Sequence, residues 1–158
     1  MPGVDALLAP ALYGFQQTRE DLARHTAGLT ARQVWARPHG LAPLGFHLRH
    51  IARSVDRLTT YLEGRSLDAA QIAALAAEME PGATLKELLA DIDSALRRAE
   101  EAIHAIDPAT FAEPRWVGRK RLPTTVLGLL VHIAEHTQRH LGQAIAAALV
   151  AQAPGLPR

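Results

Sequence analysis

The chain has 158 residues, of which 48% are hydrophobic and 21% are charged, and its formal net charge is +1. This balance predicts a folded core, and a net charge near zero provides no bulk attraction to nucleic acid or to anionic lipid. Because the sequence contains no cysteine, it excludes disulfides, thiolate metal ligands and a protein thiol nucleophile. A metal ion would therefore have to bind histidines and carboxylates.

The expected location and organisation follow from what the sequence lacks. Residues 1–10 have no basic segment ahead of an apolar one, and no uncharged run is long and apolar enough to span a membrane. We therefore expect a cytoplasmic protein that forms one domain over residues 1–158. Its expected partner is a small molecule, and neither nucleic acid nor a membrane.

Four long segments have the hydrophobic period of an α-helix, and no strand-length alternation of β-branched and polar residues is present. They cover residues 4–27, 43–63, 84–108 and 124–150. The third segment opens with Thr84 three residues before Glu87, which is the capping-box pattern of a helix start. Four amphipathic helices of this length predict a four-helix bundle.

The connections contain most of the glycine and proline residues. Between the second and third long helices, the segment from Ser66 to Met79 predicts a short extra helix across one end of the bundle. The connection before the second long helix and the one before the fourth have about fifteen residues each, which permits crossovers as well as hairpins. The predicted fold class is therefore all-α: a four-helix bundle with a short additional helix in the loop between helices two and three.

Five of the eight histidines lie on two predicted helices, His47 and His50 on the second and His132, His136 and His140 on the fourth. A spacing of four places consecutive histidines one turn apart, close enough to bind one ion together. The first and last of the three on the fourth helix cannot share an ion, because eight residues of rise separate them by about 12 Å. Helical-wheel angles place His136 and His140 nearest the core and slightly favour His47 over His50 as a third ligand.

Three neutral imidazoles with one water form the open arrangement of catalytic metal sites. A lone histidine is more often solvated or hydrogen-bonded, and we favour that interpretation for His25, His39 and His104. The run from His132 to His136 also fits the HxxEH zinc motif, but no acidic residue follows Glu135 to provide the third ligand. A di-iron site is disfavoured because no inward-facing ExxH motif has a partner.

Several segments carry a family resemblance: LTARQVWARPHG, LGFHLRHIARSVDRLTTYLEG, TLKELLADIDSALRRAEEAI and VGRKRLPTTVLGLLVHIAEHTQRHLGQ. The most specific part is the closing HxxxHxGQ from His136 to Gln143. In these segments the sequence resembles the DinB family of DinB/YfiT-like metal-binding four-helix bundles. The resemblance implies a metal site of His50, His136 and His140, and so favours His50 where the helical wheel favours His47. Leu141 stands where many members carry arginine.

The resemblance implies one divalent metal ion, zinc or nickel, and an enzyme acting on small electrophilic molecules. Members include bacillithiol and glutathione S-transferases and mycothiol-dependent maleylpyruvate isomerase. The implied reaction is thus a thiol-dependent S-transfer or a hydrolysis, with a low-molecular-weight thiol as cosubstrate. The alternative is a non-catalytic bundle that binds a metal or ligand and acts as an interaction or stress-response protein. A homodimer is compatible with both, and a DNA-associated role is disfavoured by the charge.

Supporting residues can be proposed near these histidines. Gln143 lies one turn from His140 and Ser54 one turn from His50, so both are candidates to orient the imidazoles. A basic run lies beside Trp116 just before the fourth helix and consists of Arg115, Arg119, Lys120 and Arg121. It can bind the carboxylates of a thiol cosubstrate, although a solvated loop is the commoner role of such a run.

Overall fold

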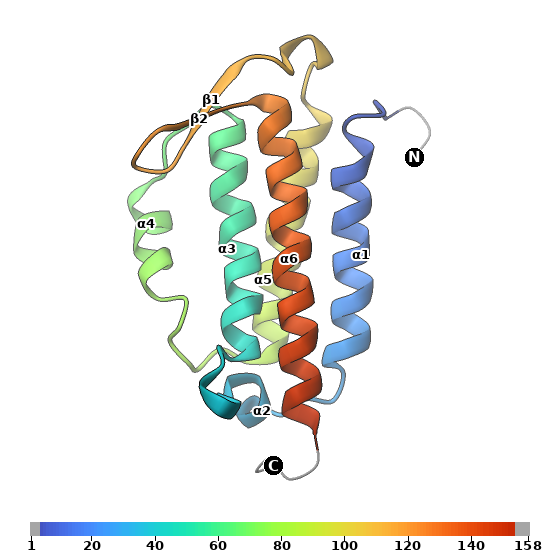
Figure 1. The fold of residues 1–158 in the computed structure, drawn as a ribbon, viewed down its shortest axis with the longest axis vertical. Helices are drawn as coiled ribbons and strands as arrows, with labels where there is room; N and C mark the ends of the chain where they lie inside the picture. The colour runs from blue at the N-terminus through green and yellow to red at the C-terminus, as the bar shows by residue number, and fades with distance from the viewer. Residues whose placement is uncertain (1–3, 154–158) are drawn as a thin grey trace.

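The computed structural model describes residues 4–153 and confirms the predicted helical bundle. Four long helices form it: α1, α3, α5 and α6 (Figure 1). Their bounds are Ala9–Thr26, Leu44–Leu62, Leu85–His104 and Val126–Gln152. The connections contain α2 (Ala31–Trp35), a 3-10 turn at Pro38–Gly40, α4 (Ala69–Ala76), a 3-10 turn at Pro108–Thr110, and the strands β1 (Pro114–Val117) and β2 (Leu122–Thr125).

The four long helices run in two parallel pairs. The side-chain amides of Gln138 and Gln152 on α6 donate to the carbonyls of Gly14 and His25, which places α6 parallel to α1. Helices α3 and α5 run together in the opposite direction, so the chain must return along the bundle between them (Figure 1). The crossover therefore lies between α3 and α5, in residues 63–84, and not in the two connections whose length suggested it.

Helix α4 lies within this crossover. It runs beside α3 along the flank of the bundle (Figure 1), and the prediction that it lies across one end is wrong. The physical reason is that α3 and α5 are parallel, so the connecting segment must span the full length of a helix, and α4 occupies part of that path.

The apolar faces expected from the hydrophobic pattern are buried and meet in one core. Phe15, Leu48, Ile51, Leu96 and Ile133 are all 0% exposed. On the edge between α1 and α5, Arg19 donates to Asp93 at 2.9 Å and to Glu100 at 2.6 Å. None of the helices within residues 4–153 has the combination of length and hydropathy that crossing a bilayer requires.

Some predicted boundaries and connections differ from the structure. The first helix begins at Ala9 rather than near residue 4, because the Asp5 side chain accepts from Leu7 N–H and holds the preceding residues in a turn. Helix α2 was not expected, although its capping box between Thr30 and Gln33 is visible in the sequence. Helix α5 ends at His104, a few residues before the expected end at Pro108.

The β-hairpin in the connection before the last helix was not expected, because the sequence shows no strand pattern there. Pro114 pairs with Thr125 and Val117 with Leu122 in an antiparallel register. Strands of four residues are too short for polar and apolar alternation to be visible in the sequence. The last residue of the hairpin also starts α6, because the Thr125 hydroxyl accepts from Gly128 N–H at 3.0 Å.

Two helical glycines give opposite predictions for the same substitution. A Cβ atom on Gly45 would lie 2.8 Å from ring atoms of Trp35, and that ring is held by its Nε1–H bond to Ala83 O at 2.8 Å. A Cβ on Gly142 would meet no atom within 4 Å. We expect Gly45→Ala to lower the free energy of unfolding by about 1–3 kcal/mol, and Gly142→Ala to raise it by about 0.5–1 kcal/mol.

Urea unfolding followed by circular dichroism measures both changes. The Gly142→Ala variant is the control for the general effect of alanine in a helix. If the two variants were stabilised alike, the contact between α3 and Trp35 would not be rigid.

Candidate metal centre

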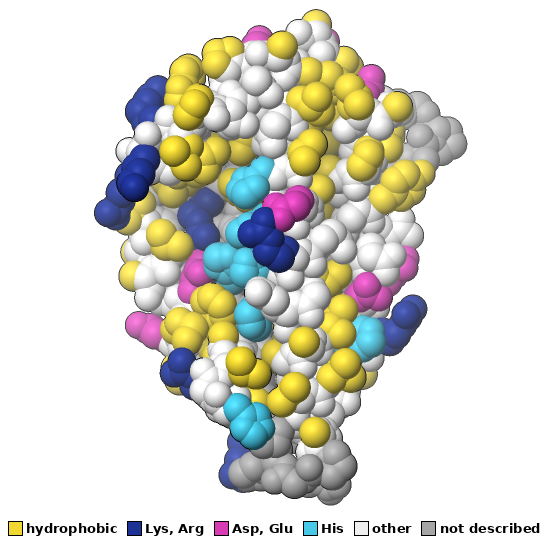
Figure 2. Space-filling view, viewed as in Figure 1, with side chains coloured by type: hydrophobic (Ala, Val, Ile, Leu, Met, Phe, Trp, Pro, Cys, Tyr) yellow, Lys and Arg dark blue, Asp and Glu magenta, His cyan; other side chains and the backbone are white. Residues whose placement is uncertain are grey.

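Three histidines from two antiparallel helices meet on one face of the bundle. His50 comes from α3, and His136 and His140 come from α6, one turn apart. One ring nitrogen of each lies within 4.8 Å of the others, and the Nε2 atoms of His50 and His136 are 3.0 Å apart. Figure 2 shows histidine side chains gathered in the middle of this face. The structure thus brings together the three residues that the resemblance implies.

His47 lies beside this cluster but outside it. Its ring centroid is 6.0 Å from that of His140, whereas the His50 centroid is 4.2 Å from the same ring. The preference for His47 from helical-wheel angles is therefore wrong, because the wheel compares directions and ignores height along the axis. Three residues of rise separate His47 from His50 by about 4.5 Å, which displaces His47 along α6 beyond His140.

Two other residues of the last helix have different positions. His132 is half-exposed, and its Nδ1 lies 3.6 Å from the Glu135 carboxylate on the surface. Its ring centroid is 5.5 Å from that of His136, outside the cluster of three. Leu141, which lies next to His140 on the same helix, is buried in the core.

The environment of His136 and His140 keeps these two imidazoles neutral at neutral pH. Burial, together with the nearby charge of His50, lowers the pKa of His136 to about 4 and that of His140 to about 4. Their Nδ1 atoms are buried and have no hydrogen-bond partner within residues 4–153. Neutral imidazoles offer the lone pairs that a metal ion needs.

The spacing of the ring nitrogens also fits a metal ion. Two nitrogen ligands of one tetrahedral zinc ion lie about 3.3 Å apart, since each bond is about 2.0–2.1 Å long. The 3.0 Å between the Nε2 atoms of His50 and His136 is close to that value. The three donors and their spacing therefore suit a divalent ion that prefers nitrogen ligands.

A buried carboxylate, Glu78, orients the first of these histidines. Its Oε2 atom lies 2.7 Å from His50 Nδ1, and its Oε1 accepts from Arg57 Nη1 at 2.8 Å. Burial raises the pKa of Glu78, but the hydrogen bonds from His50 and Arg57 outweigh burial, and the net pKa lies below its usual value. An ionised carboxylate at Nδ1 fixes the proton there, so that Nε2 presents its lone pair to the cluster.

Arginines of α3 hold the segment that carries Glu78. Arg49 Nη1 donates to the carbonyls of Ala77, at 2.9 Å, and Glu80, and Arg53 donates to the carbonyl of Ala74. These arginines and Arg57 are spaced by four residues and so lie along one side of α3. They fix the end of α4 and the residues after it, which places Glu78 beside His50.

Sequence reasoning missed Glu78 as the orienting residue. Of the two candidates it offered, Ser54 donates to the backbone carbonyl of His50 at 2.6 Å and not to the ring. Gln143 is exposed and lines a separate cavity of about 330 Å³ together with His47. The spacing of the α3 arginines was a visible signal, but it does not reveal a partner more than twenty residues away.

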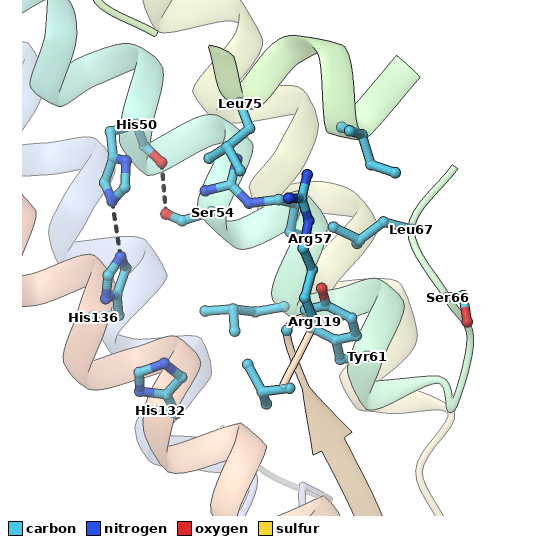
Figure 3. Close-up of a pocket in the computed structure, with 14 residues that line it drawn as sticks. His50, Ser54, Arg57, Tyr61, Ser66, Leu67, Leu75, Arg119, His132 and His136 are labelled. Atoms are coloured by element: carbon cyan, nitrogen blue, oxygen red, sulfur yellow. Dashed lines mark hydrogen bonds between the residues drawn. The ribbon is translucent and has the colours of Figure 1, made fainter. Parts of the chain in front are cut away.

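A cavity of about 560 Å³ opens beside the cluster, a size typical of small-molecule sites. His50, His136 and His132 form one side of it, and Tyr61 and Arg119 lie on the opposite side (Figure 3). Two members of the histidine cluster thus belong to the cavity wall. A ligand in this cavity would lie against the side chains of His50 and His136.

Comparison with known proteins identifies the family to which most of the chain belongs. Residues 14–144 match the model of the family described as the DinB superfamily. The matched range includes the three clustered histidines and the Glu78 carboxylate. No curated protein matches the chain at a significant level.

The pKa values of His136 and His140 predict a pH dependence of stability for the metal-free protein. In the unfolded chain these residues bind protons below about pH 6.5, whereas the folded protein leaves them neutral down to about pH 4. Unfolding therefore takes up protons between these values, and the free energy of unfolding falls as the pH is lowered from 6.5 to 4.

Thermal unfolding midpoints measured across this range test the expectation. The double variant His136→Gln/His140→Gln should lose stability less steeply than the unsubstituted protein, while His132→Gln should change the slope much less, because it acts only through its charge on His136. Equal slopes in all three proteins would contradict the lowered pKa values.

Removal of the Glu78 side chain is expected to weaken metal binding. In Glu78→Ala the His50 ring loses its orienting acceptor and Arg57 loses its partner, so we expect an affinity for Zn²⁺ about 10–100-fold lower. Glu78→Gln keeps an acceptor near Nδ1 and should lose less.

Competition with a chromophoric chelator measures the affinity. Glu135→Ala is the matched control, because Glu135 also lies beside a histidine, His132, but on the surface. The same affinity in Glu78→Ala and the unsubstituted protein would exclude the orienting role.

Proposed function

The chain belongs to the DinB superfamily, and we propose that it is a metal-dependent enzyme in which His50, His136 and His140 hold one divalent ion. The observation that carries the proposal is that His50 and His136 belong both to the histidine cluster and to the wall of a 560 Å³ cavity. A closed structural site would have a fourth protein ligand. A cluster of three ligands leaves one coordination position for another molecule.

The proposed reaction is the transfer of a low-molecular-weight thiol to a small electrophilic molecule, with hydrolysis as the related reaction when water replaces the thiol. Zinc or nickel bound here would lower the pKa of a coordinated thiol or water and so supply a nucleophile at neutral pH. The thiol sulfur forms a bond to the electrophilic carbon, the thiol proton is released, and the leaving group departs with its bonding electrons. The thiol must come from a cosubstrate, because the chain has no cysteine.

The residues of the chain have separate tasks in this proposal. Glu78 holds the proton of His50 at Nδ1 and keeps Nε2 directed at the cluster. The low pKa of His136 and of His140 leaves both rings unprotonated at neutral pH. Part of the cavity wall is apolar and is formed by Leu58, Leu67 and Leu75. Apolar wall excludes water and so strengthens electrostatic interactions inside the cavity.

Cobalt substitution tests the proposal, since Co²⁺ reports both its ligand number and a bound sulfur by absorption. We expect metal-free protein to bind about one Co²⁺ per chain with the intense visible bands of four-coordinate cobalt. Addition of 2-mercaptoethanol should then produce a sulfur-to-cobalt charge-transfer band in the near ultraviolet.

Two alanine variants serve as the test and its control. His136→Ala should lose the cobalt spectrum, while His132→Ala, one turn earlier and also in the cavity wall, should keep it. A stoichiometric ion whose spectrum is unaffected by thiol would indicate a closed site and favour the non-catalytic bundle. Full cobalt binding by His136→Ala would exclude the assigned ligands.

A further inference from the structure

The cavity beside the histidines is mainly apolar between its two sides. The apolar side chains that line it come from α3, from the crossover and from the hairpin: Leu58, Leu67, Ile72, Leu75 and Val117. Tyr61 adds an aromatic ring with a hydroxyl group. A molecule that fills this space must therefore have an apolar body in order to gain from burial.

The charges around the cavity are positive. Among its described lining residues there is no Asp or Glu, and the permanent cations are Arg57 and Arg119. Arg57 is compensated by its ion pair with Glu78 at 2.8 Å. The Arg119 guanidinium has no hydrogen bond or ion pair within the described part of the chain. One positive charge in the cavity wall is thus left without a partner.

The β-hairpin explains why this arginine differs from its basic neighbours. Arg115 donates to the carbonyl of Leu62 and to Glu113, and the guanidinium of Arg121 stacks on the ring of Trp116 at 4.9 Å. Arg119 lies in the turn between β1 and β2, next to Gly118, and both residues line the cavity. Of the four residues in the basic run, only Arg119 belongs to the wall of this cavity.

Arg119 also lies on the side away from the histidines. Figure 3 shows His50, His136 and His132 on one side of the cavity and Arg119 with Tyr61 on the other. A guanidinium binds carboxylate and similar anions through paired N–H donors. An anionic group at Arg119 would therefore direct the other end of the same molecule toward the histidine cluster.

We propose that this cavity binds an apolar small molecule with a single anionic group, which contacts Arg119 while the rest of the molecule extends toward His50 and His136. The inference rests on the proposed function and specifies its electrophilic substrate: an apolar monoanion whose reacting atom is distant from its charge. Neutral molecules gain only the apolar contacts, and cations are repelled by Arg119.

The binding test uses 1-anilinonaphthalene-8-sulfonate, an apolar monoanion whose fluorescence rises on burial. We expect metal-free protein to bind one molecule per chain, and Arg119→Gln to bind it at least about tenfold more weakly, because a charged hydrogen-bond partner is lost. Arg121→Gln is the matched control, since it removes the same charge two residues away from outside the cavity. Its affinity should be unchanged.

Competition distinguishes charge from apolar contact. Decanoate should displace the fluorophore from the unsubstituted protein better than decan-1-ol, and decylammonium should displace it least. Arg119→Gln should lose this order. Equal binding by Arg119→Gln and Arg121→Gln, or displacement by decylammonium as effective as that by decanoate, would overturn the proposal.

The same variants keep this inference separate from the proposed metal chemistry. Arg119→Gln should bind about one Co²⁺ per chain, whereas His136→Ala should lose cobalt and still bind the fluorophore. A protein that binds cobalt but shows no preference for the anion refutes the substrate class alone. A protein that shows the preference without binding cobalt refutes the metal-dependent reaction alone.

Discussion

The site depends on one buried ionic contact, the Glu78 carboxylate between His50 and Arg57. A buried carboxylate is costly unless its oxygens are paired, and here each oxygen has a partner on α3. The contact joins the crossover to the bundle at the same point where it orients a histidine of the cluster. The residues of α4 that form the cavity wall, Ile72 and Leu75, lie just before Glu78 in the chain and are fixed by the same attachment.

The arrangement of the bundle explains why the functional parts lie in its connections. Because α3 and α5 are parallel, a long crossover must run beside α3, and this crossover supplies both Glu78 and apolar cavity wall. The connection between α5 and α6 forms the hairpin that brings Arg119 to the same cavity. A bundle with four alternating directions and short loops would offer the histidines but neither of these walls. The rigid helices position the ring nitrogens, and the connections determine what can reach them.

The sequence predicted those features that depend on local periodicity. The apolar stripes predicted the four long helices, and the spacing of four placed His136 and His140 on one side of α6. The choice between His47 and His50 depends on how far α3 is displaced along α6, which a single helix does not reveal. Glu78 was not identified for the same reason, because it meets His50 and Arg57 through tertiary contacts. Arg119 was named only as one of four residues in a basic run, and the sequence does not show which of them lines the cavity. The hairpin was missed because its strands are only four residues long.

The charges of the site also fit a reaction between two anionic partners. The imidazoles of His136 and His140 are neutral at neutral pH, because the pKa of each is lowered to about 4. In the proposed reaction a divalent ion bound by neutral imidazoles would keep its full charge, so the histidine side of the cavity would favour a thiolate. The opposite side offers the guanidinium of Arg119, with the apolar wall between them. An anionic substrate and an anionic nucleophile can therefore occupy one cavity with their charges apart, so the attraction at Arg119 need not compete with the attraction at the ion. A carboxylate in place of any of the three histidines would weaken the attraction for the nucleophile, because it would neutralise part of the charge of the ion.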